Sequence, residues 1–174
     1  LLNYPIVMDN QFIKPLNFKK EKKSVIYVGG LSEIRGIKEL IMAFNNIKKA
    51  ELWLLGPWDS EKFKKTCEKL EGWSNTRYLG KVKPFEIFDY LENADIGIIT
   101  FHPYPNHIKT LATKPFEYML AGLPMIMSDF DYWKAFFKDL PLYVDPKNPV
   151  KISKIINELL LDPKKMENLG KESK

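Results

Sequence analysis

The chain has 174 residues, of which 45% are hydrophobic, and its 27 Lys and Arg outnumber its 22 Asp and Glu. This length and composition are typical of one compact domain and exclude a disordered chain. The net charge of +5 is spread over helical segments with acidic neighbours, such as SEKFKKTCEKLE, so most lysines are interpreted as solvated helix faces. A scattered excess of this kind disfavours a nucleic-acid groove and only weakly favours anionic small molecules or a membrane surface.

Cysteine and histidine are too few to form a metal or disulfide framework. Cys67 is the single cysteine, which excludes an internal disulfide and a cysteine cluster. His102 and His107 stand five residues apart in a proline-rich stretch, which disfavours a zinc site. Since no apolar run approaches the roughly 18 residues of a membrane span, we expect a reducing, cytoplasmic compartment. The first residue is Leu1 rather than Met, so we also expect a piece of a longer protein.

The pattern along the chain changes at residue 24. Residues 1–23 carry prolines and the basic run KKEKK without sustained periodicity, and are predicted to be a lead-in segment or interdomain linker. Residues 24–174 alternate short apolar runs with segments of helical periodicity. Strands are predicted at 24–29, 50–56, 76–80, 94–101, 124–129 and 141–144. Helices are predicted at 34–47, 60–72 (closed by Gly72), 83–94, 113–121, 132–140 and 148–161.

This alternation predicts the fold class. Short buried strands between helices imply right-handed crossovers, hence a doubly wound (Rossmann-like), mostly parallel α/β sheet with helices on both faces. Ligands of such sheets bind beyond the carboxyl ends of the strands, so the loops that follow the strands are the candidates for chemistry. Those loops are 29–36, 56–60, 80–84 and 102–114. Three of them begin with glycine, which lets the backbone approach a ligand or simply makes a turn.

The first loop combines two glycines with a cation. Gly29 and Gly30 follow the strand, and Arg35 stands at the entrance of the next helix. Exposed amides, a helix N-terminus and an Arg fork all suit phosphate oxygens, although Arg35 as an ordinary surface residue is the alternative. The loop matches neither the P-loop nor the G-x-G-x-x-G pattern, which disfavours an ATPase or an ordinary dinucleotide site.

The fourth loop leads into TKPFEYMLAGLP. Thr113 is a candidate N-cap, but a capping box needs Glu or Gln three residues later, where Phe116 stands. The remaining structural interpretation of Glu117 is stabilisation of the helix dipole. The functional interpretation assigns the amides of 112–114 and the charge of Lys114 to a diphosphate. Glu117 would then accept hydrogen bonds from two ribose hydroxyls, because both carboxylate oxygens are acceptors.

Five segments in order carry a family resemblance: YVGGLSEIRGIKELIMAF, LWLLGP, RYLGKV, ADIGIITF and TKPFEYMLAGLPMIMSDFDYW. They resemble the C-terminal half of GT-B glycosyltransferases of the large retaining group often called group 1. The resemblance covers about residues 24–156, and KPFEYMLAGLPMIMSD is its most specific part. It implies one half of a GT-B fold, whose two Rossmann-like domains face each other and whose C-terminal domain holds the nucleotide of a sugar-nucleotide donor.

The resemblance implies roles for individual residues. Glu117 corresponds to the ribose-binding glutamate and Arg35 to the basic residue that neutralises the donor diphosphate. The backbone at Lys81 and Val82 is expected near the base, with Gly56 and Pro57 bordering the pocket. The donor-binding residues implied are Gly29, Gly30, Arg35, Gly56, Lys81, Val82, Leu111, Ala112, Thr113, Lys114 and Glu117, of which Arg35, Lys114 and Glu117 are the candidate catalytic residues. No metal or other cofactor is implied, and the donor is of the UDP, GDP or ADP type.

Two positions depart from the commoner family pattern. Gly30 stands where the family has an arginine, and Lys109 stands where it has the first glutamate of a pair seven residues apart. A branch of the family shows the same GG…RG and TK.FEYM features, in which Lys114 supplies the second cation. Asn106 and Lys109 are then the candidates for the sugar contact.

The resemblance also implies a larger enzyme. We expect the acceptor-binding N-terminal domain, and the final helix that crosses back to it, to lie outside this chain. NYP near the start resembles the interdomain connection. This part of the enzyme is expected to be inactive alone. The function expected is retaining transfer of a hexosyl group in glycan or lipid-linked glycan assembly, and peripheral association with the inner membrane face is a further expectation. Two alternatives remain: a non-catalytic nucleotide-binding module, and a sugar-nucleotide epimerase of the same architecture.

Overall fold

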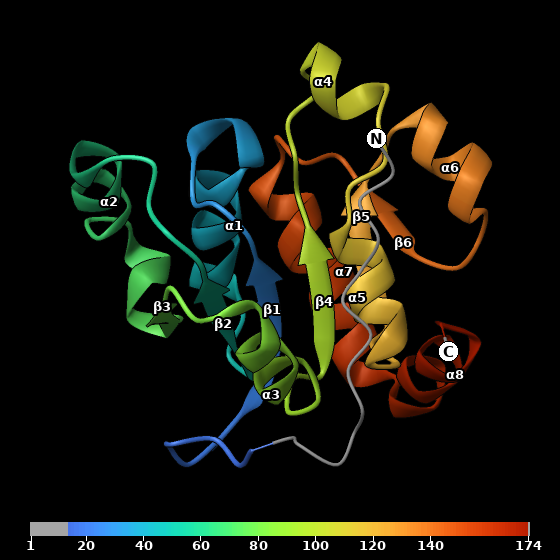
Figure 1. Ribbon diagram of the computed structural model, residues 1–174, viewed down its shortest axis with the longest axis horizontal. Helices are drawn as coiled ribbons and strands as arrows, with labels where there is room; N and C mark the ends of the chain where they lie inside the picture. Colours follow the sequence, from blue (N-terminus) through green and yellow to red (C-terminus); the bar gives the residue numbers. More distant parts are fainter. Residues whose placement is uncertain (1–13, 174) are drawn as a thin grey trace.

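The computed structural model describes residues 14–173, in which six parallel strands form one sheet of order β3-β2-β1-β4-β5-β6 (Figure 1). The strands are β1 (Lys23–Val28), β2 (Ala50–Leu55), β3 (Thr76–Gly80), β4 (Ile96–Ile99), β5 (Met125–Ser128) and β6 (Leu142–Val144). Every pairing between them is parallel. The doubly wound α/β class expected from the alternation of elements is therefore confirmed.

Helices connect and cover these strands. They are α1 (Ile37–Ala43), α2 (Glu61–Cys67), α3 (Ile87–Leu91), α4 (Pro105–Ile108), α5 (Lys114–Leu120), α6 (Asp131–Phe137), α7 (Pro149–Leu161) and α8 (Pro163–Ser173). Because parallel crossovers are right-handed, α1 lies on one face of the sheet, and α3 and α5 lie on the other. Figure 1 shows α5 against the sheet, and α7 packs beside α1 on the opposite face.

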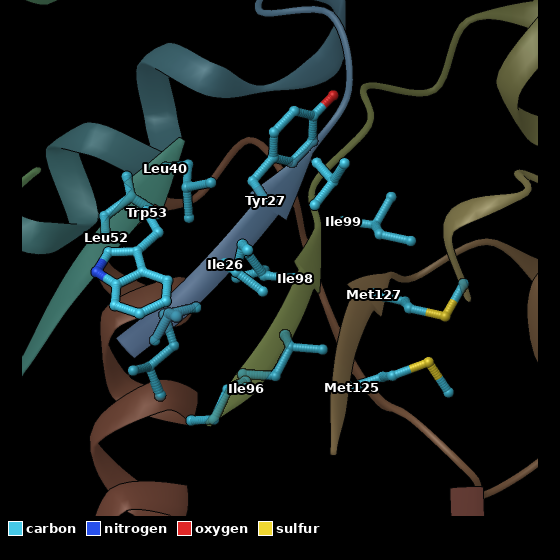
Figure 2. Packing of buried hydrophobic residues seen from close by; sticks show 14 of the residues in the cluster. Ile26, Tyr27, Leu40, Leu52, Trp53, Ile96, Ile98, Ile99, Met125 and Met127 are labelled. Atoms are coloured by element: carbon cyan, nitrogen blue, oxygen red, sulfur yellow. The ribbon is translucent and has the colours of Figure 1, made fainter. Parts of the chain in front are cut away.

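The core lies between these helices and the central strands. β1 and β4 are buried along almost their whole length because helices cover both of their faces. Figure 2 shows Ile26 and Trp53, which are register partners on the neighbouring strands β1 and β2, and the hydroxyl of Tyr27 directed toward the carboxyl end of β1. This core fixes the strand ends from which the loops of the candidate site emerge.

Some predicted helices are shorter or broken. The segment predicted as a helix at 34–47 is interrupted at Gly36, whose φ of 69° lies in the left-handed region. The helix predicted at 60–72 ends at Cys67, and the prediction that Gly72 closes it is wrong. A Cβ at Gly72 would lie 1.8 Å from the carbonyl oxygen of Ile41, so this glycine permits close packing against α1.

The segment before β1 has contacts of its own. Residues 14–22 form neither helix nor strand. Within them, the Phe18 ring meets the Trp53 ring edge-on at 5.4 Å, and Lys20 forms an ion pair with Asp95. The role of 1–23 as an interdomain linker stays a prediction, and residues 1–13, including NYP, lie outside the described residues.

Candidate functional site

The candidate site lies where the order of strand connections reverses. β1 and β4 are neighbours in the sheet, but the chain leaves β1 toward β2 on one side and leaves β4 toward β5 on the other. The loops after them therefore diverge to opposite faces at the carboxyl ends of these two strands, which is where ligands of such sheets bind. Arg35 follows β1, and Lys114 and Glu117 follow β4, so the three candidate catalytic residues belong to segments that leave this same edge of the sheet.

The glycines at the strand ends extend the sheet before the loops begin. The amide of Gly29 donates to the carbonyl of Leu55 at 2.9 Å, and the amide of Gly56 donates to the carbonyl of Gly80 at 2.8 Å. Gly56 has a φ of 146°, and a Cβ there would lie 1.9 Å from the carbonyl oxygen of Gly29. Close backbone packing therefore requires glycine at position 56. This glycine has a structural reason that does not depend on a ligand.

Arg35 is held beside the glycine loop by aromatic side chains. Its guanidinium lies 5.2 Å from the centre of the Phe101 ring, a distance at which a cation is attracted to the ring face. Burial raises the pKa of Tyr27 to about 12, and the neighbouring Arg35 opposes part of that rise. None of the ion pairs among residues 14–173 includes Arg35. Its charge is therefore available to an anion.

Gly30 leaves room next to this cation. A Cβ at Gly30 would lie 3.9 Å from the Arg35 guanidinium, an ordinary contact distance, so close packing does not require glycine here. The carbonyl of Gly30 accepts a hydrogen bond from the Tyr27 hydroxyl at 3.1 Å. Arg35 is the cation of this loop.

Lys114 and Glu117 form an ion pair within α5. The Lys114 ammonium nitrogen lies 2.7 Å from Oε1 and 2.8 Å from Oε2 of Glu117. The two side chains are only 19% and 12% exposed, so water screens the pair weakly. From the sequence, separate ligands were expected for these two residues and their contact was not, although a spacing of three on a helix permits it.

The next residue, Tyr118, anchors α5 to the two central strands. Its hydroxyl accepts a hydrogen bond from the amide of Val28 at 3.2 Å and lies 3.4 Å from the carbonyl oxygen of Ile98. Burial raises the pKa of Tyr118 well above its ordinary value. A Cβ at Gly97 would lie 2.4 Å from the Tyr118 ring, so glycine in β4 admits this side chain. Tyr118 is therefore part of the buried core.

The Arg35 turn is tied to β4 by contacts that the sequence analysis missed. The amide of His102 donates to the carbonyl of Ile34 at 2.9 Å, and the His102 ring nitrogen Nε2 lies 3.1 Å from Oε2 of Glu39. His102 is buried, and His107 contacts its carbonyl oxygen through Nδ1 at 3.0 Å. The signal in the sequence that could have pointed to His102 is its position just beyond the end of a predicted strand.

The start of α5 differs in detail from the prediction. Thr113 occupies the predicted N-cap position, but it has helical backbone angles and its side chain makes no capping hydrogen bond. Among the hydrogen bonds of the described residues, none is donated by the amides of 112–114. These residues and Leu111 are partly buried beside Lys114. Their contact with a diphosphate stays a prediction.

The remaining predicted contacts lie farther out. Lys81 and Val82 follow β3, two strands from β1, so a distance of roughly 10 Å separates them from the end of β1. A nucleotide that is extended along the edge spans this range. Asn106 lies in α4 and Lys109 just after it, and both are exposed. Lys109 and Tyr132 line an open cavity of about 610 Å³ together with residues that follow β5.

Another cavity, of about 360 Å³, belongs to the opposite edge of the sheet. It is lined by Asp95 and Pro124, which precede β4 and β5, and by residues of α8. It is therefore remote from the carboxyl ends and from the candidate site. In the described part of the chain, no group of three or more His, Cys, Asp or Glu side chains is placed to hold a metal ion. None of the helices described is long and apolar enough to cross a membrane.

A six-stranded parallel sheet whose connections reverse between β1 and β4 defines a doubly wound, Rossmann-like α/β domain. Residues 8–174 match the profile of the family described as glycosyl transferases group 1. This chain therefore belongs to that family, and the resemblance found in its sequence is confirmed. No curated protein matches the chain.

Solved structures share the fold at low sequence identity. Anabaena Alr3699/HepE, solved in complex with UDP, superposes with a TM-score of 0.74 at 18% identity over 87% of this chain and 43% of its own. Sucrose-phosphate synthase of Thermosynechococcus elongatus gives 0.75 at 21% identity over 90% and 41%. The catalytic domain of Helicobacter pylori cholesterol-alpha-glucosyltransferase gives 0.71 at 18% identity over 88% and 95%. This chain thus spans less than half of the HepE chain and corresponds to one half of a GT-B architecture.

Proposed function

We propose that this chain binds the nucleoside diphosphate of a sugar-nucleotide donor at the carboxyl ends of β1 and β4. In this proposal Arg35 binds the diphosphate, with Lys114 as the second cation, and Glu117 binds the ribose. The observation that carries it is the position of Arg35 at the topological switch point, held by Tyr27 and Phe101 and without a carboxylate partner among the described residues. The UDP held by the similar Anabaena protein supports a nucleotide as the ligand.

The proposed reaction is transfer of a hexosyl group to a glycan or lipid-linked acceptor with retention of configuration. Breaking the bond between the sugar and the diphosphate develops negative charge on the leaving oxygens. Fixed cations that lie where this charge grows stabilise the transition state more than the ground state. Arg35 is preorganised for this task because its ring contacts hold it near the glycine loop. These cations take the place of a metal ion, so no cofactor is required in the proposal.

The proposal includes an acceptor-binding domain elsewhere in a longer protein. Large apolar side chains are exposed in loops that follow four different strands: Ile34, Phe85, Tyr104 and Tyr132. Exposed apolar surface on the ligand-binding edge favours a second protein layer over open water. We therefore expect this chain alone to bind donor without transferring sugar. A cytoplasmic site with peripheral attachment at the inner membrane face completes the proposal.

Calorimetric titration with UDP, GDP and ADP tests the donor site. We expect one of these diphosphates to bind, and we expect Arg35→Gln to weaken its binding by about tenfold or more, because a charge-assisted hydrogen bond is lost. Glu117→Gln should weaken the same ligand by a similar factor. Absence of binding by all three at millimolar concentrations would refute the proposal.

A non-catalytic nucleotide-binding module is the second candidate, because Lys109 stands in place of the first family glutamate and is exposed to solvent. Turnover separates the two functions. Slow hydrolysis of a bound sugar nucleotide by the longer protein that contains this chain would favour the enzyme. Tight donor binding without any turnover, in the presence of acceptor lipids or glycans, would favour the module.

A further inference from the structure

The Glu117 carboxylate has both oxygens engaged by one ammonium group. The Lys114 nitrogen is almost equidistant from them, at 2.7 and 2.8 Å, and thus lies across the outer edge of the carboxylate. Two neighbouring hydroxyls that bind one carboxylate use this same edge, because a lone pair of each oxygen points outward there. Lys114 and a ribose diol therefore compete for the same atoms.

Displacing Lys114 from this position has a cost that depends on the ligand. The Lys114 and Glu117 side chains are 19% and 12% exposed. If the Lys114 ammonium loses its carboxylate partner here, hydration therefore replaces only part of the lost interaction energy. A nucleoside offers hydroxyls to Glu117 but nothing to Lys114. A nucleoside diphosphate offers hydroxyls to Glu117 and phosphate oxygens to Lys114, so both charged groups exchange one partner for another.

We propose that Lys114 is a specificity-determining residue, an inference that rests on the proposed function. The Lys114 ammonium covers the ribose-binding edge of Glu117 until it binds a phosphate group of the ligand instead. The ribose and the diphosphate are then recognised as a unit, and nucleosides are rejected even though they carry the correct base and sugar. Arg35 has a different role. It contacts the Phe101 ring rather than Glu117, so its charge favours phosphate without guarding the ribose site.

Matched variants distinguish a guarding lysine from a lysine that only binds phosphate. Lys114→Met keeps the length of the side chain and removes its charge, and Arg35→Gln removes a cation that does not cover Glu117. Each variant and the unmodified 174-residue chain are titrated with a diphosphate and its nucleoside, followed by chemical-shift changes of the isotope-labelled protein. The pair is UDP with uridine if UDP binds, and otherwise GDP with guanosine or ADP with adenosine.

We expect opposite responses in Lys114→Met. Uridine should bind about threefold or more tightly than to the unmodified chain, because the competing ammonium is gone, while UDP should bind about tenfold more weakly. Arg35→Gln should weaken UDP and leave uridine unchanged. Glu117→Gln should abolish the gain for uridine when combined with Lys114→Met, which shows that the gain arises at that carboxylate.

Other outcomes separate the two proposals. If UDP binds to the unmodified chain and Lys114→Met gains no affinity for uridine, Lys114 is only a phosphate ligand and the guarding role is overturned. If none of the three diphosphates binds to the unmodified chain, the donor site itself is absent. Circular dichroism of each variant confirms that the fold is retained, and Lys114→Gln replaces Lys114→Met if the methionine variant unfolds.

Discussion

Gly36 determines how Arg35 enters the site. Its φ of 69° turns the chain between the short 3₁₀ turn at Glu33–Arg35 and α1. The same residue lies so close to β4 that a Cβ would approach the carbonyl oxygen of Thr100 to 2.0 Å. A side chain is therefore excluded both by the backbone angle and by contact with a buried strand. The turn that carries Arg35 is set by this one position.

Gly36→Ala should consequently be one of the most destabilising small substitutions in the chain. We expect a loss of about 2–4 kcal/mol in the free energy of unfolding, from strain at positive φ and from the clash with Thr100. Gly80→Ala is the matched control, since Gly80 has a φ of 78° but no atom within 4 Å of a Cβ built there. Its expected cost is about 1 kcal/mol.

Urea unfolding of both glycine variants measures the difference. Equal losses in Gly36→Ala and Gly80→Ala would mean that the backbone angle alone matters and that the contact with Thr100 does not.

At the scale of elements, Asp95 joins the amino ends of β1 and β4. The amide of Ser24 donates to its carboxylate at 2.8 Å, and Lys23 pairs with the other oxygen at 2.8 Å. Burial acts to raise the pKa of Asp95, but hydrogen bonds from Lys20, Lys23 and Ser24 outweigh it, and the pKa is held below its ordinary value. One carboxylate thus connects the lead-in segment to two adjacent central strands.

The lowered pKa has a defined effect on stability. Because the folded pKa lies below the unfolded value of about 3.9, the carboxylate stabilises the fold above about pH 4, and this contribution is lost as the pH falls through the folded pKa. Asp95→Asn should lower the unfolding free energy by about 1–3 kcal/mol at neutral pH. The gap between variant and unmodified chain should narrow below about pH 4.

Thermal unfolding across this pH range tests the role of Asp95. Asp131→Asn is the control, because Asp131 is fully exposed and 3.9 Å from Lys134, and it should change stability little at any pH. A gap for Asp95→Asn that stays constant down to pH 2 would contradict the role of its charge.

Elements with strong local signals were predictable, and elements defined by distant contacts were not. The strands follow from short apolar runs, of which the first three end in glycine, and all six appear where the sequence predicts them, with small shifts at their ends. The break at Gly36 depends on Thr100, which directly follows β4 and is remote in sequence. Helix α8 was not predicted, because its packing depends on a turn that is remote in sequence. A Cβ at Gly170 in α8 would lie 2.6 Å from the carbonyl oxygen of Gly122 in that turn.

The candidate site was predictable to the level of loops. The rule that ligands bind at the carboxyl ends of parallel strands selects, from sequence alone, the edge at which the loops of the candidate site emerge. The contacts within the site were not predictable from the sequence, because the spacing of Lys114 and Glu117 permits either an ion pair or separate ligands. The pairing of His102 with Glu39 joins two elements that only the folded sheet brings together.

At the scale of the whole molecule, Cys67 reports on the integrity of the fold. It is the only cysteine in the chain, its side chain is fully buried, and it closes α2. Burial, followed by the nearby charge of Glu39, raises the pKa of its thiol to about 12. At pH 8 only about one thiol in ten thousand is therefore ionised in the folded chain, and the thiolate is the reactive form.

We expect the native chain to resist a disulfide-exchange reagent at pH 8 and to react with one equivalent after denaturation. If labelling under native conditions requires the whole fold to open, its rate should rise with urea in parallel with global unfolding. Rapid labelling without denaturant, or a rate independent of urea, would show that α2 opens separately from the sheet. The Glu39→Gln variant should label no faster than the unmodified chain if access rather than charge limits the reaction.

The glycines at the ends of β1, β2 and β3 also direct protein engineering. Gly56 packs so closely against the Gly29 carbonyl that any side chain there would clash with it. Most members of a library randomised at position 56 are therefore expected to misfold. Gly80 opens into empty space beside Lys81 and Val82, where the proposed donor would present its base. A selection for altered base preference should therefore diversify positions 80–82 and leave 29 and 56 untouched, which concentrates the search on variants that still fold.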